Sequence, residues 1–88
     1  MQSPNKKAMT KAERAHVDRV RQLPCSVCNQ AGPSEAHEIE QGQWFTSVAV
    51  CADCHRGSKN GLHGQRDMWR VMKMTELSAL NVTIARLA

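Results

Sequence analysis

The pattern of hydrophobic and polar positions predicts a helix close to the start of the chain. Thr10 and Glu13 fit a capping box, in which each side chain bonds the backbone N–H of the other residue. Apolar or small residues then recur at helical spacing, with charged residues between them, at Ala12, Ala15 or His16, Val20 and Leu23. We expect a helix over residues 11–22 that ends before Pro24, preceded by a flexible basic tail over residues 1–9.

Two short segments in the middle of the chain have the composition of β-strands. We expect a short strand over residues 36–39, and residues 44–50 are rich in aromatic and β-branched side chains. The polar segment 40–43 between them contains Gly42 and is typical of a connecting loop. Together these segments predict a β-hairpin that runs directly into Cys51.

The last third of the chain predicts two more helices. One is expected over residues 65–73 and the other over residues 76–87, with Thr75 as the N-cap of the second. Apolar residues of the second helix are spaced three, four and three apart, which forms one stripe expected to pack on the core: Leu77, Leu80, Ile84 and Leu87. The fold class is therefore a small α+β domain over residues 10–88, with no repeats and no second domain.

All four cysteines of the chain lie in two C-x-x-C pairs, Cys25 with Cys28 and Cys51 with Cys54. Two such pairs can place four thiolates around one metal ion as a tetrahedron, the usual form of a structural zinc site. The core of this 88-residue chain is thin, since it has one Phe, two Trp and no Tyr. A structural Zn²⁺ that binds only the folded state would supply the missing stability.

Other uses of the four cysteines are two disulfides, a redox dithiol or an iron–sulfur cluster. No apolar signal segment follows Met1, which disfavours a secreted disulfide protein. A disulfide within C-x-x-C is typical of redox enzymes, which do not carry two copies at this spacing. The sequence therefore favours zinc.

The chain has a net charge of +4, and its basic residues lie on both sides of the cysteine pairs. A solvated surface explains any one basic segment, but basic charge that flanks a metal site on both sides suggests a polyanion such as nucleic acid. No stretch is long enough to cross a membrane, so we expect a cytoplasmic protein with DNA as its partner.

The histidines stand at particular places relative to the cysteine pairs. His37 lies between the pairs in Ala36-His37-Glu38-Ile39, His55 follows the second pair directly, and His63 lies in Leu62-His63-Gly64 after a glycine-bounded loop. This arrangement resembles the ββα-metal core of the HNH endonuclease superfamily: a histidine on a strand, a hairpin, and a following element with further histidines. The chain is most similar to small phage-encoded HNH proteins of the recombination enhancement nuclease type, and the resemblance covers residues 24–69.

The resemblance implies a catalytic metal in addition to the structural zinc. By position, His37 matches a metal ligand on the first strand, His55 matches a ligand on the following helix, and Glu38 falls where the superfamily has its base histidine. Glu38 would act as the base or bind the metal, and His63 would fold back as a further ligand or as the base. The metal would be Mg²⁺, Mn²⁺ or a second Zn²⁺, which neutralises a scissile phosphate. The chain departs from the superfamily in having no Asn in residues 44–50 and Lys59 where a second helix ligand is usual.

The expected function is metal-dependent cleavage of DNA by a phage or prophage protein in the bacterial cytoplasm. The basic residues nearest the site are expected to contact DNA: Arg56, Lys59 and Arg66. The main alternative is a non-catalytic zinc module that docks on DNA or on a recombination or packaging protein, which Glu38 at the base position favours. A third interpretation is a subunit-interaction module that uses the C-terminal apolar stripe. In a purely structural interpretation, His37 and His55 only form hydrogen bonds beside the cysteine pairs.

Overall fold

The computed structural model describes residues 8–88, and within them the predicted first helix is confirmed. Helix α1 spans Lys11–Arg21. The Thr10 N–H donates to Glu13 Oε1 at 2.8 Å and the Glu13 N–H donates to Thr10 Oγ1 at 3.1 Å, so the capping box is complete. Most of the predicted tail, residues 1–9, lies outside the described residues.

The predicted hairpin is also confirmed, although its second strand is shorter than expected. Strands β1 (Glu35–Glu38) and β2 (Ser47–Val50) pair antiparallel, with His37 opposite Val48. The expected strand 44–50 begins instead with a 3-10 turn, η1 (Trp44–Thr46). The hydroxyls of Thr46 and Ser47 donate to the carbonyls of Gln43 and Trp44, at 3.1 and 2.6 Å. Such local bonds compete with strand pairing, which explains why the sheet begins only at Ser47.

The remaining elements are three helices. Helix α2 (Ala52–Arg56) begins at the second cysteine pair, α3 (Asp67–Val71) is a short helix, and α4 (Glu76–Leu87) ends the chain. The expected helix over 65–73 is shorter than predicted because Arg66 and Lys73 have left-handed backbones, with φ of 61° and 54°. The prediction of α4 is confirmed, with Thr75 as its N-cap. In the part of the chain that the structure describes, every helix is too short or too polar to cross a membrane.

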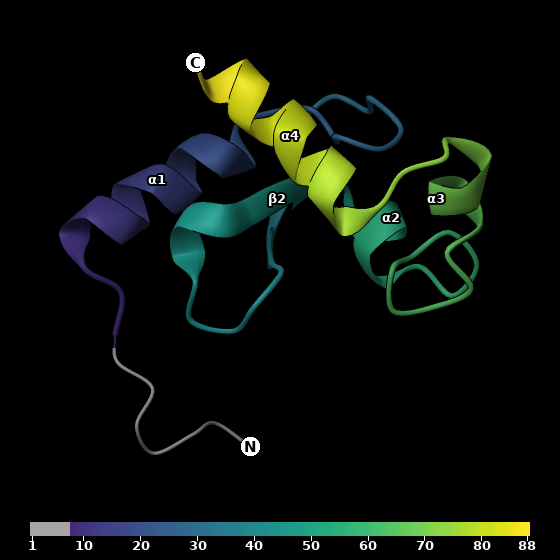
Figure 1. The fold of residues 1–88 in the computed structure, drawn as a ribbon, viewed down its shortest axis with the longest axis horizontal. Coiled ribbons are helices and arrows are strands. Elements are labelled where there is room, and N and C mark those ends of the chain that lie inside the picture. Colours follow the sequence, from purple (N-terminus) through teal and green to yellow (C-terminus); the bar gives the residue numbers. More distant parts are fainter. Residues whose placement is uncertain (1–7) are drawn as a thin grey trace.

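The helices are arranged around the hairpin (Figure 1). Helices α1 and α4 both contact β2, α2 contacts both strands, and α3 lies at the far end of the molecule. All four residues of β2 are buried, as expected for a strand covered by helices.

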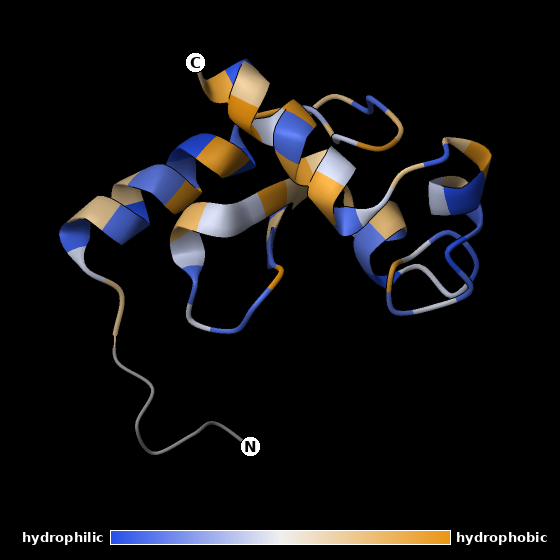
Figure 2. Cartoon of the chain, in the orientation of Figure 1, coloured by the Kyte–Doolittle hydropathy of each residue, from blue (hydrophilic) through white to orange (hydrophobic). Residues whose placement is uncertain are grey.

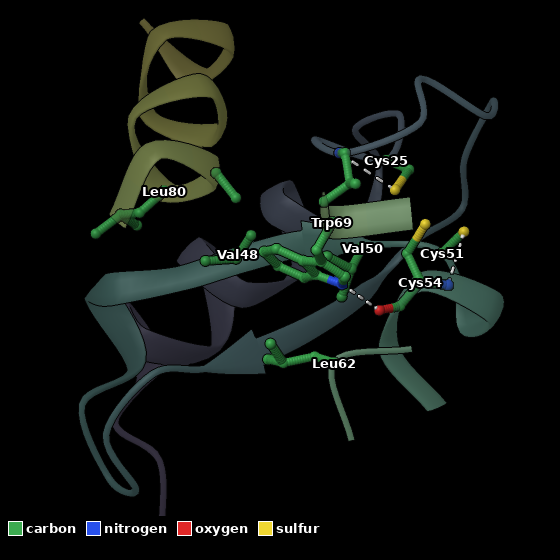
Figure 3. Close-up of a cluster of buried hydrophobic side chains, with 10 residues drawn as sticks. Cys25, Val48, Val50, Cys51, Cys54, Leu62, Trp69 and Leu80 are labelled. Carbon is green, nitrogen blue, oxygen red and sulfur yellow. Dashed lines mark hydrogen bonds between the residues drawn. The ribbon is translucent and has the colours of Figure 1, made fainter. Parts of the chain in front are cut away.

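The buried core joins the hairpin to the cysteine pairs (Figure 3). Trp69 packs beside Val50, and its indole N–H donates to the carbonyl of Cys54 at 2.8 Å. Three cysteines, Cys25, Cys51 and Cys54, belong to the same cluster of buried residues. The chemistry of the cysteine pairs is therefore part of what holds the fold together.

The predicted apolar stripe of α4 is confirmed at Leu80 and wrong at Leu77 and Ile84, because the helix turns a partly different face to the core. Leu77 and Ile84 are 73% and 49% exposed, whereas Ala79, Leu80 and Thr83 are buried. Thr83 Oγ1 accepts the N–H of Ala49 at 3.2 Å and lies 2.7 Å from the hydroxyl of Ser26. These polar contacts, together with the small Ala79 side chain, allow α4 to lie close on β2. Apolar residues nevertheless recur along the length of this helix (Figure 2).

The face of α1 also differs in part from the prediction. Val20 is buried as expected, but Ala12 and Ala15 are exposed and Val17 is buried in their place. His16 lies at the boundary, with its ring 5.2 Å from the ring of Phe45. The small alanines add little apolar area, so the two valines determine which face is buried.

Candidate metal centre

The structure brings the two cysteine pairs together into one four-cysteine cluster. The Sγ atoms of Cys25, Cys28, Cys51 and Cys54 all lie within 4.8 Å of one another. The Sγ atoms of Cys28 and Cys51 are 3.7 Å apart. Two sulfur ligands of a tetrahedral zinc site, each with a Zn–S bond of about 2.3 Å, lie about 3.8 Å apart. The cluster can therefore bind a structural metal such as zinc.

The cysteines occupy an environment that disfavours uncompensated thiolates. Burial is the main reason that the pKa values of the Cys51 and Cys54 thiols are raised. Burial acts in the same direction on Cys25, but N–H donors from Cys28, Cys51 and Val27 outweigh it and lower the pKa of that thiol. The Cys54 N–H likewise donates to Cys51 Sγ at 3.4 Å. Four neighbouring thiolates need a cation to balance their charge, so the donor set fits a divalent metal.

A second cluster, which we call the three-histidine cluster, consists of His37, His55 and His63. Their ligand nitrogens lie within 4.8 Å of one another. The ring of His37 is 5.0 Å from that of His55 and 5.6 Å from that of His63, measured between centroids. The residues come from β1, from α2 and from the loop before α3, so three separate parts of the chain converge here.

The loop that carries His63 is folded tightly against the end of α2. The N–H of Leu62 donates to the carbonyl of Cys54 at 2.8 Å, and that of His63 donates to the carbonyl of His55 at 3.3 Å. A Cβ atom on Gly61 would lie 2.4 Å from the Gly57 carbonyl oxygen, so only glycine allows this approach. The glycines of this loop thus explain how a histidine eight positions after His55 reaches the same cluster.

Two glutamates hold the rings of the cluster in place. His55 Nδ1 lies 2.7 Å from Glu35 Oε1, and His37 Nε2 lies 2.8 Å from Glu76 Oε2. Histidines that bind metals commonly donate their other ring N–H to a carboxylate, which fixes the tautomer and the ring orientation. When each histidine donates in this way, His55 Nε2 and His37 Nδ1 are left to accept a ligand.

Burial, and not the charge of Glu35, favours a neutral His55. Arg56 donates to both oxygens of Glu35, and this hydrogen-bonded pair is the main reason that the pKa of Glu35 is below its usual value. Burial lowers the pKa of His55, although the bond to Glu35 acts in the opposite direction. A neutral imidazole is the form that binds a metal, so these surroundings suit a ligand role.

A solvent-open hollow of about 660 Å³ lies over the three-histidine cluster. Other residues that line it include Arg21, Glu38, Trp44, Arg66 and Glu76. Glu38 ends β1 and accepts the Gly42 N–H at 3.2 Å, so it shares the hollow without joining the three-histidine cluster.

The expected DNA-contacting residues occupy different surroundings. Arg66 lines the hollow, whereas Arg56 is paired with Glu35. Lys59 is exposed and lies outside the described lining of the hollow.

Sequence reasoning missed three residues of this site: Glu35, Glu76 and Arg21. Glu35 and His37 share a face of β1 because they are two residues apart, and this alternation was the available signal. Glu76 lies 39 positions after His37, and nothing in the sequence pairs the two. Three imidazoles that open on a hollow form a set able to hold a transition metal with a free coordination position.

No family model, curated protein or solved structure matches the chain. Membership of the HNH superfamily therefore stays a prediction from the motif residues.

Proposed function

We propose that the protein is a metal-dependent endonuclease of the HNH type that hydrolyses phosphodiester bonds in DNA. The observation that carries this proposal is the convergence of His37, His55 and His63 beneath a solvent-open hollow. We assign a structural Zn²⁺ to the four-cysteine cluster. Cys54 and His55 are adjacent in α2, so this short helix would both anchor the fold and present a catalytic ligand.

The three-histidine cluster favours particular metals. Imidazole nitrogens suit Zn²⁺ and other first-row transition ions, whereas Mg²⁺ prefers oxygen ligands and retains its water. Of the ions expected from the sequence, Mg²⁺, Mn²⁺ or a second Zn²⁺, we therefore assign a second Zn²⁺ or a similar transition ion to this cluster. When bound, such an ion supplies Lewis-acid stabilisation of the charge that develops on the phosphate oxygens.

The residues of the chain would contribute orientation and proton transfer. Glu35 and Glu76 hold the rings of His55 and His37, so the ligand nitrogens are presented in fixed directions. Glu38 lines the same hollow, and we assign it to accept a proton from the attacking water. A carboxylate is a weaker base than an imidazole near neutral pH, so we expect a slow enzyme.

A non-catalytic DNA-binding module is the second candidate. The contact that favours it is the bond from the Gly42 N–H to Glu38, because this bond uses an acceptor position of the assigned base. In such a module the three-histidine cluster would serve only to fix the loop of His63 against β1. The two candidates differ in whether changes to the histidines abolish a chemical step.

A plasmid-nicking assay with protein that retains its cysteine-bound zinc tests the proposal. We expect nicking when a transition ion is added, loss of nicking in His37→Ala and His55→Ala, and full nicking in His16→Ala. His16 is a matched control because it lies on α1 outside the three-histidine cluster. Glu38→Ala should lose most of the rate, and Glu38→His should keep or raise it near neutral pH, since a histidine is the better base.

Two results would contradict this assignment. If folded, zinc-loaded wild type binds DNA but does not nick it with any added ion, the result supports the binding module. An equally active His37→Ala variant would place the catalytic site elsewhere.

A further inference from the structure

Arg21 stands beside the three-histidine cluster although it belongs to a distant part of the sequence. It is the last residue of α1, and it lines the hollow. Its carbonyl accepts the N–H of Ser34 at 2.7 Å. Ser34 directly precedes β1, so this bond holds the end of α1 next to the strand that carries His37.

Arg66 lines the same hollow from the start of α3. Its Nε–H donates to the carbonyl of Leu62 at 2.9 Å, which orients the guanidinium and leaves the terminal Nη groups for a ligand. Its left-handed backbone, with φ of 61°, is a costly conformation for a residue other than glycine. Such conformations are concentrated at functional sites, and here the conformation is joined to a side chain that faces the hollow.

The other expected arginine is already engaged. Arg56 donates through Nε and Nη2 to Glu35, which in turn bonds His55. Moving Arg56 to a phosphate would break that pair and release the carboxylate that orients His55. Among the described residues that line the hollow, the arginines are Arg21 and Arg66, and lysine is absent.

We propose that Arg21 and Arg66 form a phosphate-binding pair that holds the polynucleotide backbone over the three-histidine cluster, and that Arg56 instead positions His55 through Glu35. The inference rests on the proposed function, because it takes the phosphodiester backbone of DNA as the ligand. A guanidinium presents paired N–H donors that match the oxygens of a phosphate group. Two such groups from α1 and α3 would hold the backbone without reading its sequence.

Binding measurements test this pair without any cleavage step. A labelled DNA duplex is titrated with protein that retains its cysteine-bound zinc and has no added metal, over a range of NaCl concentrations. Each lost phosphate contact should lower the steepness of log affinity against log salt by about 0.9. We expect this decrease in Arg21→Gln and in Arg66→Gln. We expect no change in Arg14→Gln, because Arg14 is exposed on the same helix and does not line the hollow.

Three outcomes would overturn the inference. If Arg21→Gln and Arg14→Gln show the same salt dependence, with zinc content and helicity unchanged in both, Arg21 does not contact a phosphate. That result would not contradict the proposed nuclease function. If wild type has no affinity for DNA at any salt concentration, both the proposed function and the phosphate-binding pair are contradicted. If inorganic phosphate displaces DNA no more strongly than chloride at equal ionic strength, in wild type as in Arg21→Gln, the pair is not a phosphate site. Arg21→Lys should keep the salt dependence of wild type and bind more weakly, since a lysine lacks the paired donors.

Discussion

Two glutamates set the orientation of two of the three histidines of the cluster. Glu35 lies between His55 and Arg56 and bonds both, while Glu76 reaches His37 from the first turn of α4. A ring held through one nitrogen presents the other in a fixed direction, which lowers the entropy lost when a ligand binds. The metal affinity of the three-histidine cluster should therefore depend on residues that do not touch the metal.

We predict that Glu35→Ala and Glu76→Ala each weaken metal binding at the three-histidine cluster by about 10- to 100-fold. Glu76→Gln should lose less, because its amide oxygen can still accept the N–H of His37. The measurement is a Co²⁺ titration of protein that retains cysteine-bound zinc, in which visible absorption reports Co²⁺ binding. The absence of thiolate charge-transfer bands shows that Co²⁺ has not replaced the zinc at the cysteines. Glu40→Ala is the control, because Glu40 is exposed in the loop after β1 and its substitution removes the same charge. Equal Co²⁺ affinity in Glu35→Ala, Glu76→Ala and Glu40→Ala would show that the two glutamates have no positioning role.

At the scale of elements, local signals predicted the structure where the deciding contacts are local. The capping residues Thr10 and Thr75 lie within three positions of their partners, and both helices begin where the sequence places them. The start of β2 was missed because the hydroxyls of Thr46 and Ser47 turn back to carbonyls three residues earlier. The buried face of α4 was predicted only in part, at Leu80, because Thr83 bonds Ala49 and only the folded chain brings these two together.

The observed face of α4 leads to a prediction on two leucines of the same helix. Leu80 is 8% exposed and belongs to the buried core, whereas Leu77 is 73% exposed. Leu80→Ala should lower the free energy of unfolding by about 2–5 kcal/mol, since it leaves a cavity. Leu77→Ala should change it by less than about 0.5 kcal/mol. Denaturant unfolding of zinc-loaded protein measures both values, and a larger loss in Leu77→Ala would contradict the orientation of α4.

At the scale of the molecule, the four-cysteine cluster and the three-histidine cluster were predictable to different degrees. The four-cysteine cluster follows from spacing, because each C-x-x-C pair brings two sulfurs together locally and the hairpin joins the pairs. The place of His63 in the three-histidine cluster depends on glycines that let a loop fold back on α2. Arg21 and Glu76 enter the site from the ends of α1 and α4, and their positions follow from how those helices pack.

The cysteines are also central to the stability of the whole chain. Three of the ten residues of the buried core are cysteines, and the largest side chain there, Trp69, donates to the carbonyl of Cys54. A structural Zn²⁺ binds small domains with about 10–16 kcal/mol near neutral pH, which is comparable to the total stability of a typical domain. Loss of the metal would leave the four cysteines as separate thiols, so the two C-x-x-C pairs would no longer be cross-linked.

We predict that the purified protein carries one Zn²⁺ that resists mild chelators, and that its removal by a strong chelator unfolds the chain in one cooperative step. Elemental analysis measures the zinc, and circular dichroism together with Trp fluorescence follows unfolding during chelation. Cys28→Ser should lose the zinc and the fold, because Cys28 supplies one of the four sulfurs of the cluster. His63→Ala, which changes only the three-histidine cluster, should keep both and serves as the control. A protein that is folded while free of zinc, with its cysteines reduced or paired as disulfides, would contradict the assignment of zinc to this cluster.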